Sequence, residues 1–118
     1  MTSREKRRRL ADERWPEMSN LLACHLGQDW PEEYGDRFSA IDGAMKDYPL
    51  DYRQLVAKQW RNWIAQLDSE SSVKEYLNDY FGINIYFKSE FEAVEFADEI
   101  YRRLIDSIKD ETSGKYLS

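Results

Sequence analysis

Apolar residues along this chain recur mainly every three or four positions, the spacing that places them on one face of an α-helix. The pattern predicts five helices, at residues 3–26, 36–47, 48–67, 72–81 and from 89 onward. The third has the clearest apolar stripe, formed by Tyr52, Leu55, Val56, Trp60, Trp63, Ile64 and Leu67. The stripe of the last helix consists of Ala93, Val94, Ala97, Ile100, Tyr101, Leu104 and Ile108. We therefore expect an all-α fold, a single compact bundle of about five helices.

Proline, glycine and capping residues mark where these helices begin and end. Pro16 lacks a backbone N–H and predicts a break or kink in the first helix, whereas Gly82 ends the fourth. Ser72–Glu75 and Ser89–Glu92 both have the spacing of a capping box, in which the serine hydroxyl accepts from the backbone N–H three residues later. The fourth and fifth helices are therefore expected to start at these two serines.

The helical period fails between the last two helices, where Ile83, Ile85 and Phe87 alternate with less apolar residues. A strand of only about three steps needs a partner strand, and we identify none elsewhere in the sequence. We therefore expect an extended, packed connector at residues 83–88.

Residues 21–36 form the most distinctive segment of the chain, LLACHLGQDWPEEYGD. An apolar helical run stops at Gly27, because glycine readily adopts the left-handed conformation that ends a helix, and Pro31 prevents the helix from continuing. Gln28, Asp29 and Trp30 lie between them, at a fixed corner of the chain. We expect Trp30 to fold back onto the core and Asp29 to cap a neighbouring backbone group.

The same residues carry a family resemblance. A first helix that begins near Trp15-Pro16, runs through Leu21-Leu22 and closes on Gln28-Asp29-Trp30 resembles that of the small immunity proteins of bacterial contact-dependent growth inhibition systems. A weaker similarity covers the order of the later helices and the stripe from Phe91 to Leu104. The chain departs from the family at residues 24–27, Cys-His-Leu-Gly, where many members have an aromatic residue, phenylalanine and histidine before the motif.

The resemblance implies that the protein binds the toxic carboxyl-terminal domain of a cognate effector in a 1:1 complex and blocks it. Such toxins are frequently nucleases, whose active sites must be basic in order to hold phosphates. An inhibitor of this kind occupies the place of the substrate or obstructs access from elsewhere, and the sequence does not choose between these modes. The protein itself is expected to have no enzymatic activity and no cofactor.

The length of the chain indicates one domain, spanning residues 1–118. Charge is distributed unevenly along it. Residues 1–14 hold six cations and three acids and so carry +3, and since the net charge is −6, residues 15–118 carry −9. An acidic body repels nucleic acid and attracts a basic partner. The basic start at 1–14 is expected to be a frayed, solvated helical turn, and residues 112–118 a loose tail. No apolar run approaches the roughly 20 residues of a membrane span, and the first residues are charged, so we expect a cytoplasmic protein.

Few residues in the sequence carry catalytic or metal-binding chemistry. The single cysteine, Cys24, excludes an internal disulfide and a multi-thiolate metal site, and its place in an apolar helix favours a buried, inert thiol. The single histidine, His25, is expected to be a hydrogen-bonded core or boundary residue. We find neither a phosphate-binding glycine loop nor a calcium-binding loop. Two alternatives to an immunity protein are an acidic adaptor or nucleic-acid mimic that titrates a basic regulator, and a small carboxylate-dependent hydrolase.

The acidic residues divide into those with a cation four positions later on a helix and those without. Two pairs of the first kind lie on the last helix, Asp98 with Arg102 and Glu99 with Arg103. The second kind includes Glu90, Glu92 and Glu95, and also the acids around Tyr34, a residue type that anchors many interfaces. The predicted toxin-binding residues are Glu32, Glu33, Tyr34, Asp36, Glu92 and Glu95. The four tryptophans and eight tyrosines exceed what a core of this size must bury, so we also expect some of them at the surface.

Overall fold

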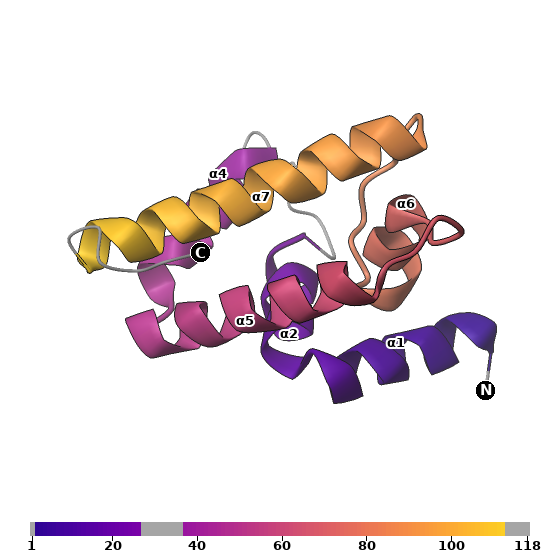
Figure 1. Ribbon diagram of the computed structural model, residues 1–118, viewed down its shortest axis with the longest axis horizontal. Helices are drawn as coiled ribbons and strands as arrows, with labels where there is room; N and C mark the ends of the chain where they lie inside the picture. Colours follow the sequence, from indigo (N-terminus) through magenta and orange to yellow (C-terminus); the bar gives the residue numbers. More distant parts are fainter. Residues whose placement is uncertain (1, 27–36, 113–118) are drawn as a thin grey trace.

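The fold consists mainly of helices (Figure 1). The computed structural model describes residues 2–26 and 37–112 of the chain. Its α-helices are α1 (Ser3–Arg14), α2 (Pro16–Leu26), α4 (Arg37–Asp47), α5 (Leu50–Gln66), α6 (Val73–Glu75) and α7 (Glu90–Glu111), and a π-helix, η1, spans Tyr76–Tyr80. No strand occurs in the two described ranges. The prediction of an all-α helical bundle is thereby confirmed.

The long helices α5 and α7 lie side by side and run in opposite directions (Figure 1). Helix α2 packs against α5, and α4 packs against both α2 and α7. Helix α1 packs against α2 and η1. The largest wholly buried side chains include Trp15, Trp60, Trp63, Phe81 and Phe87. Because burial of apolar surface is the main favourable term in folding, these rings carry much of the stability.

The helix boundaries agree with the proline and serine signals in the sequence. Trp15 separates α1 from α2 with φ −135° and ψ 60°, directly before Pro16. The hydroxyls of Ser72 and Ser89 accept from the backbone N–H three residues later, at 3.1 and 3.2 Å. The predicted break and both predicted caps are therefore confirmed. Of the predicted tail, only Thr112 belongs to the described ranges, and its N–H still bonds to the last turn of α7.

The apolar stripe of α5 is narrower than predicted. Val56, Trp60 and Trp63 are buried as expected, whereas Leu55 is 39% and Ile64 45% exposed. Each exposed residue is next in sequence to a buried one, which places it about 100° further round the helix axis. That rotation turns both side chains away from α2 and α7, so they do not belong to the core.

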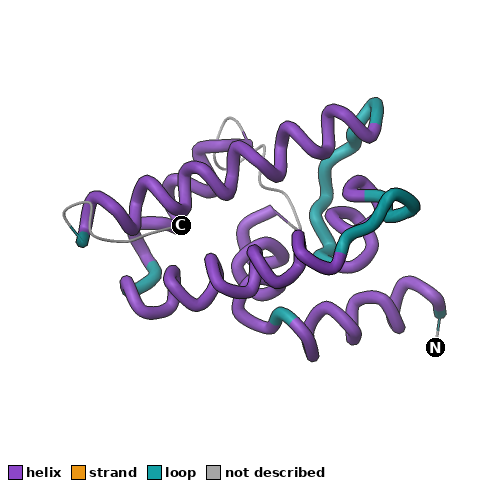
Figure 2. The backbone as a smooth tube through the Cα atoms, in the orientation of Figure 1, coloured by secondary structure: helices purple, strands orange, loops and turns teal. Residues whose placement is uncertain are grey.

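The segment between η1 and α7 is the extended, packed connector that the sequence predicts, and Figure 2 shows it as a length of loop joining the two helices. Gly82 begins it with φ +70°, a left-handed conformation that favours glycine. Ile83 and Phe87 are buried, and the side-chain amide of Asn78 donates to the carbonyls of Ile83 and Ile85 at 2.9 and 2.8 Å. These bonds satisfy backbone groups that have no strand partner.

The fourth predicted helix is α-helical for only one turn before it widens into η1. The N–H of Phe81 bonds to the carbonyl of Tyr76, five residues back, at 2.9 Å. The wider turn lets Tyr80 stack on Tyr76 with ring centroids 4.3 Å apart, while Phe81 packs against Trp63 at 5.3 Å. These aromatic contacts stabilise a helical geometry that is rarely favourable by itself.

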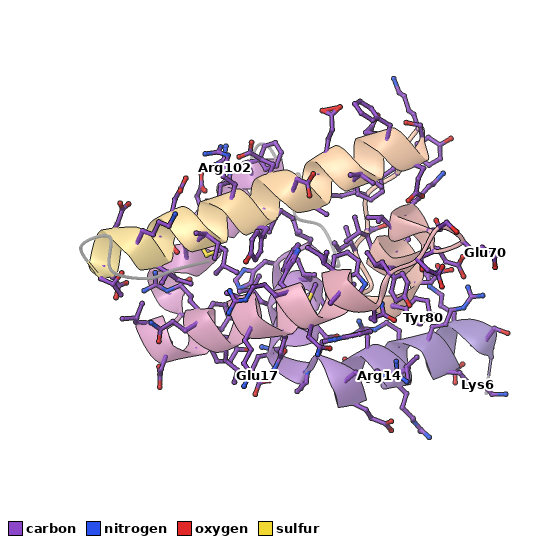
Figure 3. The ribbon with its side chains drawn as sticks, in the orientation of Figure 1. Lys6, Arg14, Glu17, Glu70, Tyr80 and Arg102 are labelled. Atoms are coloured by element: carbon purple, nitrogen blue, oxygen red, sulfur yellow. The ribbon has the colours of Figure 1, made fainter. Side chains whose placement is uncertain are left out.

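The basic start of the chain is a packed helix, so the prediction of a frayed, solvated turn was wrong. The guanidinium of Arg7 lies 2.9 Å from the carboxylate of Glu75 and 2.8 Å from that of Asp79. Arg8 donates to the carbonyl of Tyr80 at 2.8 Å, and Figure 3 shows Tyr80 where η1 faces α1. The acids that neutralise Arg7 come from a distant part of the chain, so the local pattern of charges does not reveal them.

Candidate protein-binding surface

The structure describes only part of the predicted recognition site. Glu92 and Glu95 lie on the amino-terminal half of α7. The predicted corner motif and the acids beside it lie outside the described residues, so they stay predictions: Gln28, Asp29, Trp30, Glu32, Glu33, Tyr34 and Asp36. The candidate site is therefore built here from α7 and the elements beside it.

Glu92 and Glu95 line an open hollow of about 480 Å³ on α7, which we call the α7 hollow. Its lining residues come from α4, from the cap of α7 and from α7 itself: Phe38, Ser89, Phe91, Glu92, Glu95, Phe96 and Glu99. Phe96 is buried and stacks on Phe38, with ring centroids 5.7 Å apart. Phe91 is 71% exposed. The hollow thus combines an aromatic floor with a rim of carboxylates.

Helical spacing explains why Phe91 belongs to this surface and not to the core. Phe91 lies two positions before the buried Ala93, about 200° round the helix axis. Glu95 and Glu99 follow Phe91 at intervals of four residues, which places all three on one side of α7. The core stripe predicted for this helix begins at Ala93, which is buried, and the angles along the helix place Phe91 outside that stripe.

The carboxyl-terminal edge of the hollow already holds an arginine. The guanidinium of Arg103 lies 4.7 Å from the centre of the Phe38 ring, and it bonds to Asp42 at 2.6 Å and to Glu99 at 3.0 Å. The hydrogen bond and the charge of Asp42, with those of Glu99, raise the pKa of Arg103 above its ordinary value. An aromatic ring and two carboxylates thus hold one cation on this surface.

Glu99 forms an ion pair with each of two arginines of α7, Arg102 and Arg103. Partial burial acts to raise its pKa, but hydrogen bonds and charge from Arg102 and Arg103 outweigh burial and hold the pKa below its ordinary value. The predicted pair of Glu99 with Arg103 is confirmed, and that of Asp98 with Arg102 was wrong. Arg102 instead bonds to Glu99 and, at 3.1 Å, to Asp106, since one carboxylate lies within reach of both guanidinium groups.

Glu90, the first residue of α7, has a structural role. Its carboxylate accepts from the hydroxyl of Ser72 at 2.9 Å and from the backbone N–H groups of Val73 and Lys74 at 2.6 and 3.3 Å. It therefore caps the amino terminus of α6 and ties the start of α7 to it. Glu90 is consequently not offered to a partner.

Some aromatic residues lie at the surface, as the composition suggested, but those with largely exposed rings are not tryptophans. Trp15 and the two tryptophans of α5, Trp60 and Trp63, are all buried. Tyr86 is 80% exposed, beside the ammonium of Lys74 at 5.3 Å. Among the residues that the structure describes, Tyr86 and Phe91 have largely exposed rings, and Phe91 lines the α7 hollow.

The single histidine and the single cysteine lie near the end of α2. The Nε2 of His25 is 3.3 Å from the hydroxyl of Tyr48, which confirms a hydrogen-bonded boundary residue. Burial lowers the pKa of His25 below 6.5, against the charge of Asp47, which acts to raise it. Cys24 is exposed, so the prediction of a buried thiol was wrong. It lies two positions from the buried Leu22 and Leu26 and hence on the far side of the helix.

Within residues 2–26 and 37–112, no group of three or more His, Cys, Asp or Glu side chains is placed to hold a metal ion. In the same ranges no helix is long and apolar enough to cross a membrane. No protein-family model matches the chain, and neither the curated proteins nor the solved structures give a match. The function is therefore inferred from the chemistry of the surface and from the resemblance in the corner motif.

Proposed function

We propose that this protein is the immunity protein of a contact-dependent growth inhibition system, which binds a basic toxin domain in a 1:1 complex and neutralises it in the cytoplasm. The observation that carries the proposal is the α7 hollow, where the exposed ring of Phe91 lies among the carboxylates of Glu92, Glu95 and Glu99. The resemblance at Gln28-Asp29-Trp30 supplies the identity of the partner.

A surface of this composition suits a basic protein. Residues 15–118 carry a charge of −9, and such a field attracts a cationic domain and raises the rate of encounter. Aromatic residues dominate the energetic centres of interfaces, and an exposed ring surrounded by acids offers such a centre. A nuclease domain has the complementary chemistry, because it needs cations to hold phosphates. Occupation of those cations, or of a surface beside them, inhibits the toxin.

The direct test is co-expression with the toxic carboxyl-terminal domain encoded beside this gene, followed by affinity purification and kinetic measurement. We expect a 1:1 complex whose association slows as salt rises, because the screening length falls from about 10 Å at 0.1 M to about 3 Å at 1 M. The proposal would be refuted if the purified protein carried no partner, or if it carried nucleic acid instead.

Charge reversal locates the interface. Glu95→Lys should weaken toxin binding by about tenfold or more, because like charges at an interface cost several kcal/mol. Glu13→Lys is the matched control, since Glu13 is an exposed residue of α1 and the change in net charge is identical. The double change Glu32→Lys with Glu33→Lys tests the corner acids in the same way. All three variants should keep their unfolding free energy within about 0.5 kcal/mol of the parent, as surface substitutions usually do.

A further inference from the structure

We infer that the α7 hollow is an arginine-binding site, in which a guanidinium group of the partner packs on the ring of Phe91 with its charge facing Glu95. The inference rests on the proposed function for the identity of the partner, but the affinity of the hollow for arginine is a property of this chain. It therefore makes a claim that can be tested without the toxin.

This surface already binds one arginine of the chain itself. Arg103 lies over the ring of Phe38 while Glu99 and Asp42 hold its charge. One and two turns closer to the start of α7, Glu95 and Phe91 repeat the combination of carboxylate and ring on the same side of the helix. The difference is that Phe91 is 71% exposed. The chain thus presents a second ring and carboxylate of the kind that hold Arg103.

The charge of the hollow suits a cation. Among the described residues that line the hollow, three are carboxylates, three are phenylalanines and one is a serine. The amino terminus of α7 opposes these acids with only about half a positive charge. The field in the hollow therefore favours a cation, even after the guanidinium groups of Arg102 and Arg103 have neutralised much of the charge of Glu99.

The size and shape of the hollow suit an arginine side chain. A volume of about 480 Å³ lies within the range of about 300–1,000 Å³ that small-molecule sites occupy, so the hollow has room for a long side chain and its adjoining backbone. A planar guanidinium stacks on an aromatic face and bonds to a carboxylate at the same time, whereas the compact, strongly hydrated ammonium of lysine does this less well. Arginine is therefore the preferred occupant.

The test is a titration of the isotopically labelled full chain with N-acetyl-arginine amide, followed by amide chemical shifts. The matched probe is N-acetyl-citrulline amide, which has nearly the same shape and no charge. With the arginine amide we expect saturable shifts that centre on residues 89–99. The corresponding lysine amide should bind at least about fivefold more weakly, and the citrulline amide should cause no shifts. Equal responses to arginine and citrulline, or shifts spread evenly over all surface acids, would overturn the inference.

Variants give the site-specific control. Phe91→Ala and Glu95→Gln should each weaken arginine binding about fivefold or more, through loss of the ring and of the charge-assisted bond. Tyr86→Ala and Asp98→Asn should change it less than twofold, since one removes an exposed ring and the other an exposed carboxylate outside the lining of the hollow. Melting curves check the fold of every variant. If Phe91→Ala were to unfold, Glu95→Gln would still decide the matter.

Failure of this inference and failure of the proposed function have different signatures. If the toxin binds and N-acetyl-arginine amide does not bind the hollow, the arginine site is refuted while the immunity function stands. If arginine binds the hollow and no toxin binds, the site stands while the immunity function is refuted. Where both hold, replacement of one surface arginine of the toxin should remove the effect of Phe91→Ala, because the two side chains then belong to one contact.

Discussion

Replacing Arg53 by methionine should lower the free energy of unfolding by about 2–4 kcal/mol. Arg53 is only 3% exposed, and burial lowers the pKa of its guanidinium below the ordinary value. Its Nε donates to the carbonyl of Tyr48 at 3.0 Å, and its Nη1 donates to the hydroxyl of Ser107 at 3.1 Å. Its charge is paired with Glu111. One side chain thus joins the loop before α5 to the last turns of α7.

The magnitude follows from these contacts. Hydrogen bonds from a charged donor contribute about 1.5–3 kcal/mol each, and methionine replaces the apolar stem without replacing the bonds to Tyr48 and Ser107. Both acceptors are half-buried, so hydrogen bonds from water replace part of the free energy lost with the guanidinium bonds. The pair with Glu111 adds less than about 1 kcal/mol, because that carboxylate is 50% exposed. The desolvation of the guanidinium offsets part of the total, which leaves about 2–4 kcal/mol.

Urea unfolding followed by tryptophan fluorescence measures the change, since three buried tryptophans report on the core. With a slope of about 2 kcal/mol per molar urea, the midpoint of Arg53→Met should fall by about 1–2 M. Glu111→Gln is the control, and its midpoint should fall by less than about 0.5 M. A midpoint of Arg53→Met at or above that of the parent would refute the reasoning, because the cost of burying the guanidinium would then equal or exceed the value of its bonds.

Three further changes test other parts of the fold. The folded state holds the pKa of His25 below 6.5, so the unfolded state takes up the proton first as the pH falls below 6.5, and stability declines. Between about pH 7.5 and 5.5 the urea midpoint of His25→Gln should therefore decline less than that of the parent, and equal declines would contradict this. Gly82→Ala should lower stability by about 1–2 kcal/mol in thermal unfolding, because φ is +70° and the new Cβ would lie 3.3 Å from the guanidinium of Arg8. An unchanged melting temperature would exclude strain at this position. Ser72→Ala should cost about 0.5–2 kcal/mol through loss of the cap to the Glu75 N–H, measured in urea, whereas Ser72→Asn, which keeps a capping oxygen, should cost less.

The helices could be predicted because their signals act over a few residues. A proline breaks the helix at Pro16, and serine side chains cap the turns that follow Ser72 and Ser89. Periodicity also identified the connector, because its buried residues Ile83 and Phe87 alternate with exposed ones. None of these features depends on what lies elsewhere in the chain.

Contacts between distant segments could not be predicted in the same way. The apolar character of Leu55 and Ile64 indicates a core face, but only the positions of α2 and α7 decide that these two side chains lie outside it. In the candidate site, Glu95 could be identified because it has no cation four residues further along α7, as the sequence shows. The ring of Phe38, which completes the hollow, comes from α4 and is placed there by the packing of α4 on α7.

The contact between α1 and η1 also sets an order of events during synthesis. Arg7 and Asp79, and likewise Arg8 and Tyr80, are separated by 72 positions in the chain. At about 5–20 residues per second, a ribosome needs roughly 4–14 s to add that length. Throughout that interval the first helix lacks the segment that neutralises Arg7 and packs against the helix. Docking of α1 is therefore a late step on the nascent chain, and the cell has several seconds in which other proteins can bind this helix first.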